Sequence, residues 1–193
     1  MRRQTITAAL LACGLLTTGS VLAAPPSAEM LGFTCAACHG YDGVSNGPAT
    51  PSIAGMPTEY FVEAMKAFKT GERPATVMDR IAKGYSDEEL EIMAKFFAEK
   101  AYIPAKQTFD NAKAQKGAKI HERACEKCHS EGGRFTEEDA GILAGQWMPY
   151  LTFAFEDFTS GKRPMDKKMA SRVEKLSKDD IEALVHYYGS QQK

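Results

Sequence analysis

The feature that most constrains this chain is a pentapeptide, Cys-x-x-Cys-His, that occurs twice at a spacing of 90 residues. The two copies are Cys35–His39 and Cys125–His129. In this pattern two thiols add to the vinyl groups of a haem, and the histidine that follows supplies one axial nitrogen to the iron. The sequence therefore predicts two covalently bound haem c groups, attached through thioethers at Cys35, Cys38, Cys125 and Cys128.

The two motifs lie in matching copies of a longer segment. At a shift of 90 residues, the 40 positions from Cys35 to Pro74 contain 12 identities and no gap. One extra residue then enters the second copy, so that Ser86 matches Ser177 at a shift of 91. An internal repeat of this kind indicates two units of one fold.

Both units have the sequence pattern of helices. Apolar residues recur with helical spacing over 60–68 and 150–158. Ser86 and Ser177 are each followed by acidic residues in the first turn, which is typical of a helix start. Shorter helices are expected over 28–34 and 112–124, and no alternating strand pattern is present. The predicted fold is all-α, with tandem haem-binding domains at 24–102 and 103–193 and a linker near 100–106.

Residues 1–23 have the character of a secretory signal peptide. A basic start at Arg2 and Arg3 precedes an apolar run, and cleavage is expected after Ala23. The apolar run is too short and too interrupted to span a membrane. A lipoprotein signal ending at Cys13 and twin-arginine export are weaker interpretations. We expect ordinary secretion into the periplasm.

The charge balance gives little indication of a partner. The chain has 24 Lys and Arg against 25 Asp and Glu, and removal of the signal peptide leaves a net charge of −3. Nothing in this balance indicates binding to nucleic acid. No further apolar run indicates a membrane span, so the expected partners are other proteins.

Cysteine usage supports haem attachment over the alternatives. The chain has five cysteines: Cys13 lies in the signal peptide and the other four lie in the two motifs. Four cysteines in an exported protein would ordinarily suggest disulfides, but a histidine follows each pair directly. A zinc site would require the two pairs to converge, whereas the repeat places each pair in its own unit.

The sixth iron ligands are inferred from the repeat. His39 and His129 are the expected fifth ligands. Met78 and Met169 are the one pair of methionines that the repeat superposes, and we expect them as the sixth ligands. Met165 is the alternative for the second haem, because it directly follows an Arg-Pro pair that the repeat preserves.

Two further histidines have no counterpart in the repeat. His121 and His186 are therefore interpreted as ordinary surface or half-buried side chains. With histidine and methionine bound, each iron would have no open position for a substrate. The chain is expected to carry electrons and to have no catalytic residues of its own.

The wider sequence resembles the soluble dihaem cytochromes built from two class I domains. More specifically, it is similar to the cytochrome subunit of flavocytochrome c sulfide dehydrogenase. The segments that carry the resemblance are Ala28–Leu31, Gly47–Ala54, Arg80–Ser86, Pro104–Asp110, Cys125–Gly133, Leu143–Leu151 and Arg163–Ser171.

The resemblance implies a periplasmic heterodimer. A separate FAD-containing subunit would oxidise sulfide, these haems would receive its electrons, and a soluble c-type cytochrome would collect them. It also implies the same ligand set, since the chain departs from the family at none of those positions. A free-standing dihaem shuttle that feeds a terminal oxidase is the alternative. A dihaem peroxidase is a third, and it would require one haem without a methionine ligand.

An obligate partner would leave an apolar surface on the isolated chain. Five large residues have no clear place on the helical stripes, so some of them should be exposed if the chain is a permanent subunit: Tyr41, Tyr85, Tyr102, Ile103 and Trp147. The alternative is that they cover the contact between the two haem units.

The first prediction concerns cofactor content. The mature protein, expressed with cytochrome c maturation enzymes, should carry two covalent haems, because both thiol pairs are intact. Haem staining after denaturing electrophoresis and an intact mass measure this directly. A mass that lacks two haems would contradict the assignment of both motifs.

Overall fold

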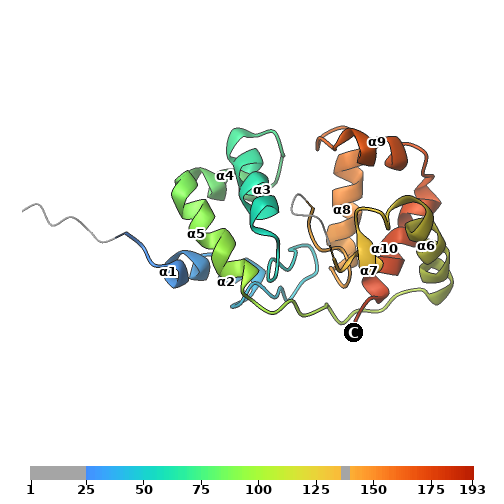
Figure 1. The fold of residues 1–193 in the computed structure, drawn as a ribbon, viewed down its shortest axis with the longest axis horizontal. Helices are drawn as coiled ribbons and strands as arrows, with labels where there is room; N and C mark the ends of the chain where they lie inside the picture. The colour runs from blue at the N-terminus through green and yellow to red at the C-terminus, as the bar shows by residue number, and fades with distance from the viewer. Residues whose placement is uncertain (1–24, 136–139) are drawn as a thin grey trace, which may run out of the picture.

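The computed structural model describes residues 25–135 and 140–193. The expected signal peptide at 1–23 lies outside the described residues. Within them all regular structure is helical, as predicted, and the helices form two groups that stand side by side (Figure 1). The expected domain bounds, 24–102 and 103–193, stay a prediction, and the extended segment between the groups lies between α5 and α6.

The first group of helices surrounds one apolar core. Leu90, Met93 and Phe97 are fully buried and pack against Phe61 and Met65. The elements of this group are α1 (Ala28–Phe33), α2 (Ala36–His39), α3 (Thr58–Thr70), α4 (Met78–Ile81), a 3₁₀ turn (Ala82–Gly84) and α5 (Asp87–Ala98).

The second group has its own core, in which two long helices pack along each other. Ile120 of the first of these meets Leu184 and Tyr188 of the second, and Leu151 closes the cluster. The elements are α6 (Asn111–Ala124), α7 (Ser130–Gly133), α8 (Met148–Thr159), α9 (Lys167–Val173) and α10 (Lys178–Ser190).

The predicted helix starts are confirmed by capping boxes. The Ser86 hydroxyl accepts from the amide of Glu89 at 3.2 Å, and the Glu89 carboxylate accepts from the amide of Ser86 at 2.8 Å. Ser177 and Asp180 make the same pair of bonds at the start of α10. Each box satisfies two backbone donors that a helix start leaves without partners.

The segment that connects the two groups of helices is hydrogen-bonded to the second group. It runs without helix from the end of α5 to α6, along one edge of both groups (Figure 1). The Ala105 amide donates to the Gly145 carbonyl at 2.8 Å. The Gln107 side chain donates to the Gln146 carbonyl and accepts from the Met148 amide. These bonds hold the start of the second unit in place before α6 begins.

The two groups meet across a pseudo-symmetric contact. The Gln146 side chain is buried, accepts from the Ser52 amide at 3.0 Å and donates to the Ser52 carbonyl at 2.7 Å. The repeat relates Gln146 to Met56 and Ser52 to Ile142. The related contact is present, because the Ile142 amide donates to the Met56 sulfur at 3.4 Å. Each unit therefore places the side chain of the same repeat position, Met56 or Gln146, over the equivalent loop of the other.

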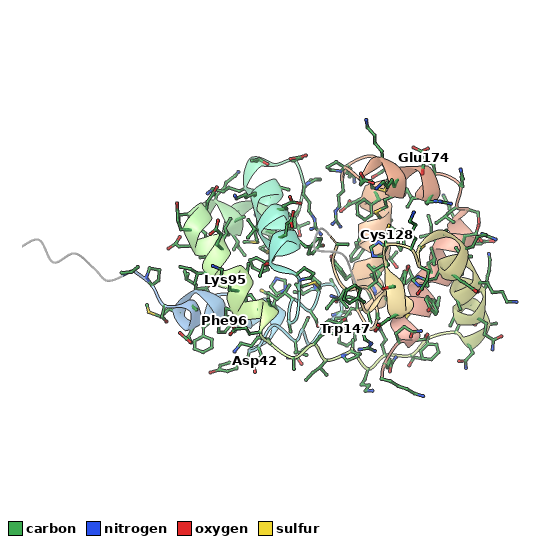
Figure 2. The ribbon with its side chains drawn as sticks, in the orientation of Figure 1. Asp42, Lys95, Phe96, Cys128, Trp147 and Glu174 are labelled. Carbon is green, nitrogen blue, oxygen red and sulfur yellow. The ribbon has the colours of Figure 1, made fainter. Side chains whose placement is uncertain are left out.

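Trp147 extends this contact at the boundary between the groups (Figure 2). Its indole N–H donates to the Ser45 carbonyl at 3.1 Å. The ring also lies against Gly47, where a Cβ would come within 2.6 Å of the indole. Because φ at Gly47 is +83°, glycine suits both the backbone and the close approach of the ring. Trp147 thus covers the contact between the units, as the alternative interpretation proposed.

The second prediction tests the contact between the units. Gln146→Ala should lower the free energy of unfolding of the dihaem protein by about 2 kcal/mol, because it strands a buried amide and carbonyl of Ser52. Gln115→Ala, on the exposed face of α6, should change it by less than about 0.5 kcal/mol. Urea unfolding followed by circular dichroism measures both. Equal effects of the two variants would contradict a stabilising role for the contact.

Candidate haem sites

Each Cys-x-x-Cys-His motif forms one helical turn. The His39 amide donates to the Cys35 carbonyl at 2.9 Å, and the His129 amide donates to the Cys125 carbonyl at 3.0 Å. In each motif the first cysteine is half-buried and the second is exposed. A single turn therefore presents two thiols and an imidazole together, which is the arrangement that covalent haem attachment requires.

The His39 side chain is held in one orientation. It is 8% exposed, and its Nδ1 lies 2.8 Å from the carbonyl oxygen of Pro51. Because a carbonyl can only accept, Nδ1 carries the proton and Nε2 keeps its lone pair for a metal. Burial lowers the pKa of His39, and the bond to Pro51 opposes this effect only in part. The neutral ring that an iron ligand requires is thus the favoured form.

The cysteines have no competing role within the described residues. Those four cysteines form no disulfide. Burial raises the pKa of the Cys35 and Cys125 thiols. Across residues 25–135 and 140–193, no group of three or more His, Cys, Asp or Glu side chains could hold a metal ion. The two cysteine pairs therefore do not converge into a zinc site.

The predicted sixth ligands occupy similar local positions. Met78 is the first residue of α4 and Met169 lies in the first turn of α9. In the first unit, Met56, Met65 and Met93 are buried and Met30 is 65% exposed, so Met78 is the methionine at the edge of the core. In the second unit, Met165 and Met169 are both half-buried. Their ligand roles stay a prediction.

A group of four side chains between the two units was not foreseen from the sequence. Arg73 donates to the Tyr150 hydroxyl at 3.5 Å, and Arg163 donates to the Tyr60 hydroxyl at 3.4 Å. The repeat relates these two bonds to each other. Each guanidinium also stacks on an aromatic ring of the helix that precedes it, α3 for Arg73 and α8 for Arg163. The identity of these tyrosines and arginines between the copies was the available signal, but the tyrosines were interpreted as apolar core.

This group fits the acidic side chains of a haem. Burial alone would raise the pKa of Tyr60, but Arg73 and Arg163 lower it to about 8. Among the described residues, neither arginine forms an ion pair with a carboxylate. Two positive charges that lie half-buried side by side are favoured by anionic partners. The propionates of two haems, anchored one in each unit, would supply them.

One sequence interpretation is wrong. His121 is not a surface or half-buried side chain but is 2% exposed, and it contacts Tyr188 and Glu126. His186 is half-buried, as expected, and its Nδ1 accepts from the Asp110 amide at 2.9 Å. An apolar and buried counterpart in the repeat, Leu31, was the available signal for burial, but the lack of a second histidine at that position favoured the surface interpretation.

Comparisons with known proteins agree with this geometry. Residues 112–187 match the family model of cytochrome c oxidase, cbb3-type, subunit III. The chain is 33% identical to cytochrome c4 of Pseudomonas aeruginosa over 190 residues, covering 92% of this chain and 94% of the relative.

The chain belongs to the dihaem cytochrome c4 family. The crystal structure of reduced cytochrome c4 from Pseudomonas stutzeri is similar in fold, with a TM-score of 0.73 and 28% identity over 82% of this chain and 93% of the other. Two tandem cytochrome c domains and two covalent haem c groups follow, and the function is electron transfer. No described helix is long and apolar enough to cross a membrane.

Two relatives connect this dihaem cytochrome with sulfur compounds. The cytochrome subunit of sulfide dehydrogenase from Chlorobaculum tepidum is 48% identical over 69 residues, which cover 36% of this chain and 62% of the relative. The thiosulfate dehydrogenase electron acceptor of Thiomonas intermedia is 30% identical over 177 residues, covering 86% of this chain and 79% of the relative.

The third prediction tests the methionine ligands. Met78→Ala and Met169→Ala should each abolish half of the weak near-infrared absorption from sulfur–iron bonding, and each should lower the reduction potential of one haem. Met165→Ala is the matched control and should leave the absorption intact. If Met165→Ala halves the absorption and Met169→Ala does not, the ligand of the second haem is Met165.

Proposed function

We propose that this dihaem cytochrome is the electron-accepting subunit of a periplasmic flavocytochrome c sulfide dehydrogenase. A separate FAD-containing subunit would oxidise sulfide and pass electrons to the two haems, and a soluble c-type cytochrome would collect them. His39 with Met78 and His129 with Met169 would hold the irons. Each bound haem would supply one-electron transfer.

The observation that carries this proposal is an exposed apolar patch on the first unit. The patch consists of Met30, Phe33, Tyr41 and Ile103, which are 65%, 43%, 67% and 55% exposed. Phe33 and Tyr41 stack with their ring centroids 4.9 Å apart. Large apolar side chains that gather on a surface mark an interface with another molecule.

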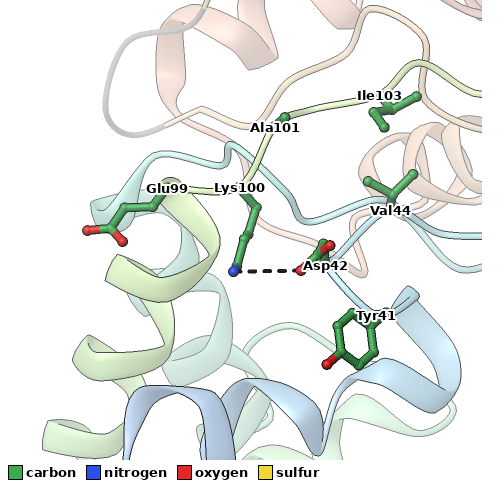
Figure 3. A pocket seen from close by; sticks show the side chains of 7 residues that line it. All are labelled: Tyr41, Asp42, Val44, Glu99, Lys100, Ala101 and Ile103. Atoms are coloured by element: carbon green, nitrogen blue, oxygen red, sulfur yellow. Dashed lines mark ion pairs between the residues drawn. The ribbon is translucent and has the colours of Figure 1, made fainter.

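The patch borders a hollow of about 410 Å³ next to the first haem motif. Figure 3 shows Tyr41 and Ile103 on two sides of this hollow, with the Lys100–Asp42 ion pair of 3.6 Å between them. Tyr41 follows His39 by two residues. A partner seated here would therefore stand close to the turn that anchors the first haem.

The second unit does not repeat the patch at the related positions, and its exposed large apolar residues among those described, Phe135 and Phe153, lie elsewhere. The repeat relates Phe33 to Arg123 and Tyr41 to Glu131, and both of these charged residues are exposed. An apolar surface suits a permanent subunit, whereas charged surfaces suit fast and reversible encounters. This difference supports a flavoprotein on the first unit and a soluble cytochrome on the second.

A free-standing shuttle that feeds a terminal oxidase is the second candidate. The full-length match to cytochrome c4 favours it, because the match to the sulfide dehydrogenase subunit is confined to 69 residues. Three of the five large residues that have no clear place on the helical stripes also make contacts within the chain. Trp147 and Tyr102 pack at the contact between the units, and the Tyr85 hydroxyl bonds to Thr34.

The fourth prediction separates these candidates. Dihaem protein purified from its native host should bring a flavoprotein with it in a fixed ratio, and Tyr41→Glu should abolish this by placing a charge in the apolar interface. Glu131→Gln, at the related position of the second unit, should leave the flavoprotein bound. The absorption of flavin and haem in the eluted complex measures the ratio.

Two outcomes would contradict the subunit proposal. The wild-type protein could elute without flavin, in which case the free-standing shuttle is the better description. Alternatively, Tyr41→Glu could retain the flavoprotein at the wild-type ratio, in which case the interface lies elsewhere. Haem content and circular dichroism of each variant establish that the dihaem fold is intact.

A further inference from the structure

The second unit contains a buried hydrogen-bonded group formed by His121, Glu126 and Tyr188, which we call the His121 triad. Nδ1 of His121 lies 3.0 Å from the Tyr188 hydroxyl, and Nε2 contacts the Glu126 carboxylate. The other oxygen of Glu126 accepts from the Glu131 amide at 3.1 Å, which fixes the carboxylate beside the ring. The imidazole is 2% exposed, whereas the Glu126 side chain is 42% exposed and connects the triad to solvent.

The first unit has no equivalent of the triad. The repeat relates its three members to Leu31, Ala36 and Phe97, which are all apolar. The correspondence is structural as well, because the Gly55 amide donates to the Phe97 carbonyl and the Gly145 amide donates to the Tyr188 carbonyl, both at 2.8 Å. Three positions that touch one another thus differ together between two otherwise matching units.

The triad lies beside the attachment point of the second haem. Glu126 directly follows Cys125, and the Tyr188 hydroxyl contacts the Cys125 sulfur. A charge gained or lost at His121 therefore acts on the second haem across a protein interior, where charges interact more strongly than in water. The first haem lies in the other unit.

The geometry suits both protonation states of the imidazole. In the neutral ring, Nε2–H donates to Glu126 and Nδ1 accepts from the Tyr188 hydroxyl. In the charged ring both nitrogens donate, so the Tyr188 hydroxyl accepts and turns its own proton towards Cys125. Burial raises the pKa of Tyr188 well above its ordinary value, so this hydroxyl turns without losing its proton.

The other groups around His121 do not compete with it. From α10 come Tyr187, at 5.1 Å between ring centroids, and Tyr188. Burial raises the pKa of Tyr187 too, so both phenols stay neutral. Arg172 of α9 acts on Cys125, which becomes a thioether when haem is attached. Among the described residues, Glu126 is the charged group paired with His121.

We propose that His121 is a proton-binding group coupled to reduction of the second haem. When one electron from the donor reduces that haem from ferric to ferrous, His121 binds one proton from solvent. The reason is electrostatic: reduction removes one positive charge at the iron, so a positive charge on the nearby imidazole becomes more favourable. This inference rests on the presence of two haems and not on the identity of the electron donor.

Linkage gives the sign of the effect. If reduction strengthens proton binding at His121, protonation must favour reduction of the second haem by the same factor. The potential of the second haem therefore falls as the pH rises through the titration of His121. The reduction equilibrium changes at most tenfold for each pH unit, which is about 59 mV for a one-electron couple. Transfer from the first haem to the second is consequently more favourable at lower pH.

The fifth prediction tests the triad on the dihaem protein. Spectroelectrochemical titration from about pH 5 to about pH 9 spans the ordinary range of histidine, and haem-methyl NMR signals distinguish the two haems. In the wild type, the reduction potential of the second haem should change more with pH than the reduction potential of the first haem does. His121→Leu, which installs the residue of the first unit, should abolish this extra dependence.

Two further variants keep the test decisive. Glu126→Gln keeps a hydrogen-bond acceptor but removes the negative charge that favours the protonated form of His121, so the extra pH dependence of the second haem should move to lower pH. His186→Gln, on the same helix as Tyr188 but outside the triad, should behave as the wild type. The proposal is overturned if the second haem has no extra pH dependence, or if it keeps the wild-type dependence in His121→Leu. Flavoprotein binding should be unchanged in these variants. The subunit proposal and the proton-binding proposal can therefore fail or hold independently of each other.

Discussion

Covalent attachment of a flat, largely apolar cofactor is the interaction on which the rest of this structure depends. Each unit has roughly 80 residues, a size at which a chain buries too little surface for a stable core of its own. The buried side chains of α3 and α5, or of α6, α8 and α10, form only a small cluster in each unit. The two thiols and the imidazole on one helical turn would join a haem to this cluster, and its rings would then become part of the core.

The same dependence explains how two such units combine. A haem carries two carboxylates, and burying them requires positive partners. Arg73 and Arg163 extend from the two units towards the shared boundary, where each contacts a tyrosine of the other. Around them Gln146 and Met56 lie over matching loops. The contact between the units is thus a two-fold interface within a single chain, and its two arginines would bind the propionates of both haems at one place.

The sequence predicted the parts of this structure that are local or repeated. The capping boxes at Ser86 and Ser177 and the helices ahead of the haem motifs follow from short-range patterns, and all of them are present. The Arg–Tyr contacts were missed because they join residues about 80 to 100 positions apart, and helical periodicity cannot show which element a tyrosine meets. His121 was misread for a related reason. Its hydrogen-bond partners are Glu126, five residues away, and Tyr188, on another helix.

The most informative positions are those at which the two copies of the repeat differ. Several positions at the haem motifs and at the contact between the units are the same in both copies: the cysteine pairs, the histidines that follow them, Tyr60 with Tyr150 and Arg73 with Arg163. Two of the differences bear on the proposals: the outer surface, where Arg123 and Glu131 replace Phe33 and Tyr41, and the second haem site, where a polar triad replaces Leu31, Ala36 and Phe97. A relay between two identical sites has no preferred direction. On the two proposals above, one difference would set the partner and the other the haem potential, so together they would direct electrons from the apolar face of the first unit towards the second.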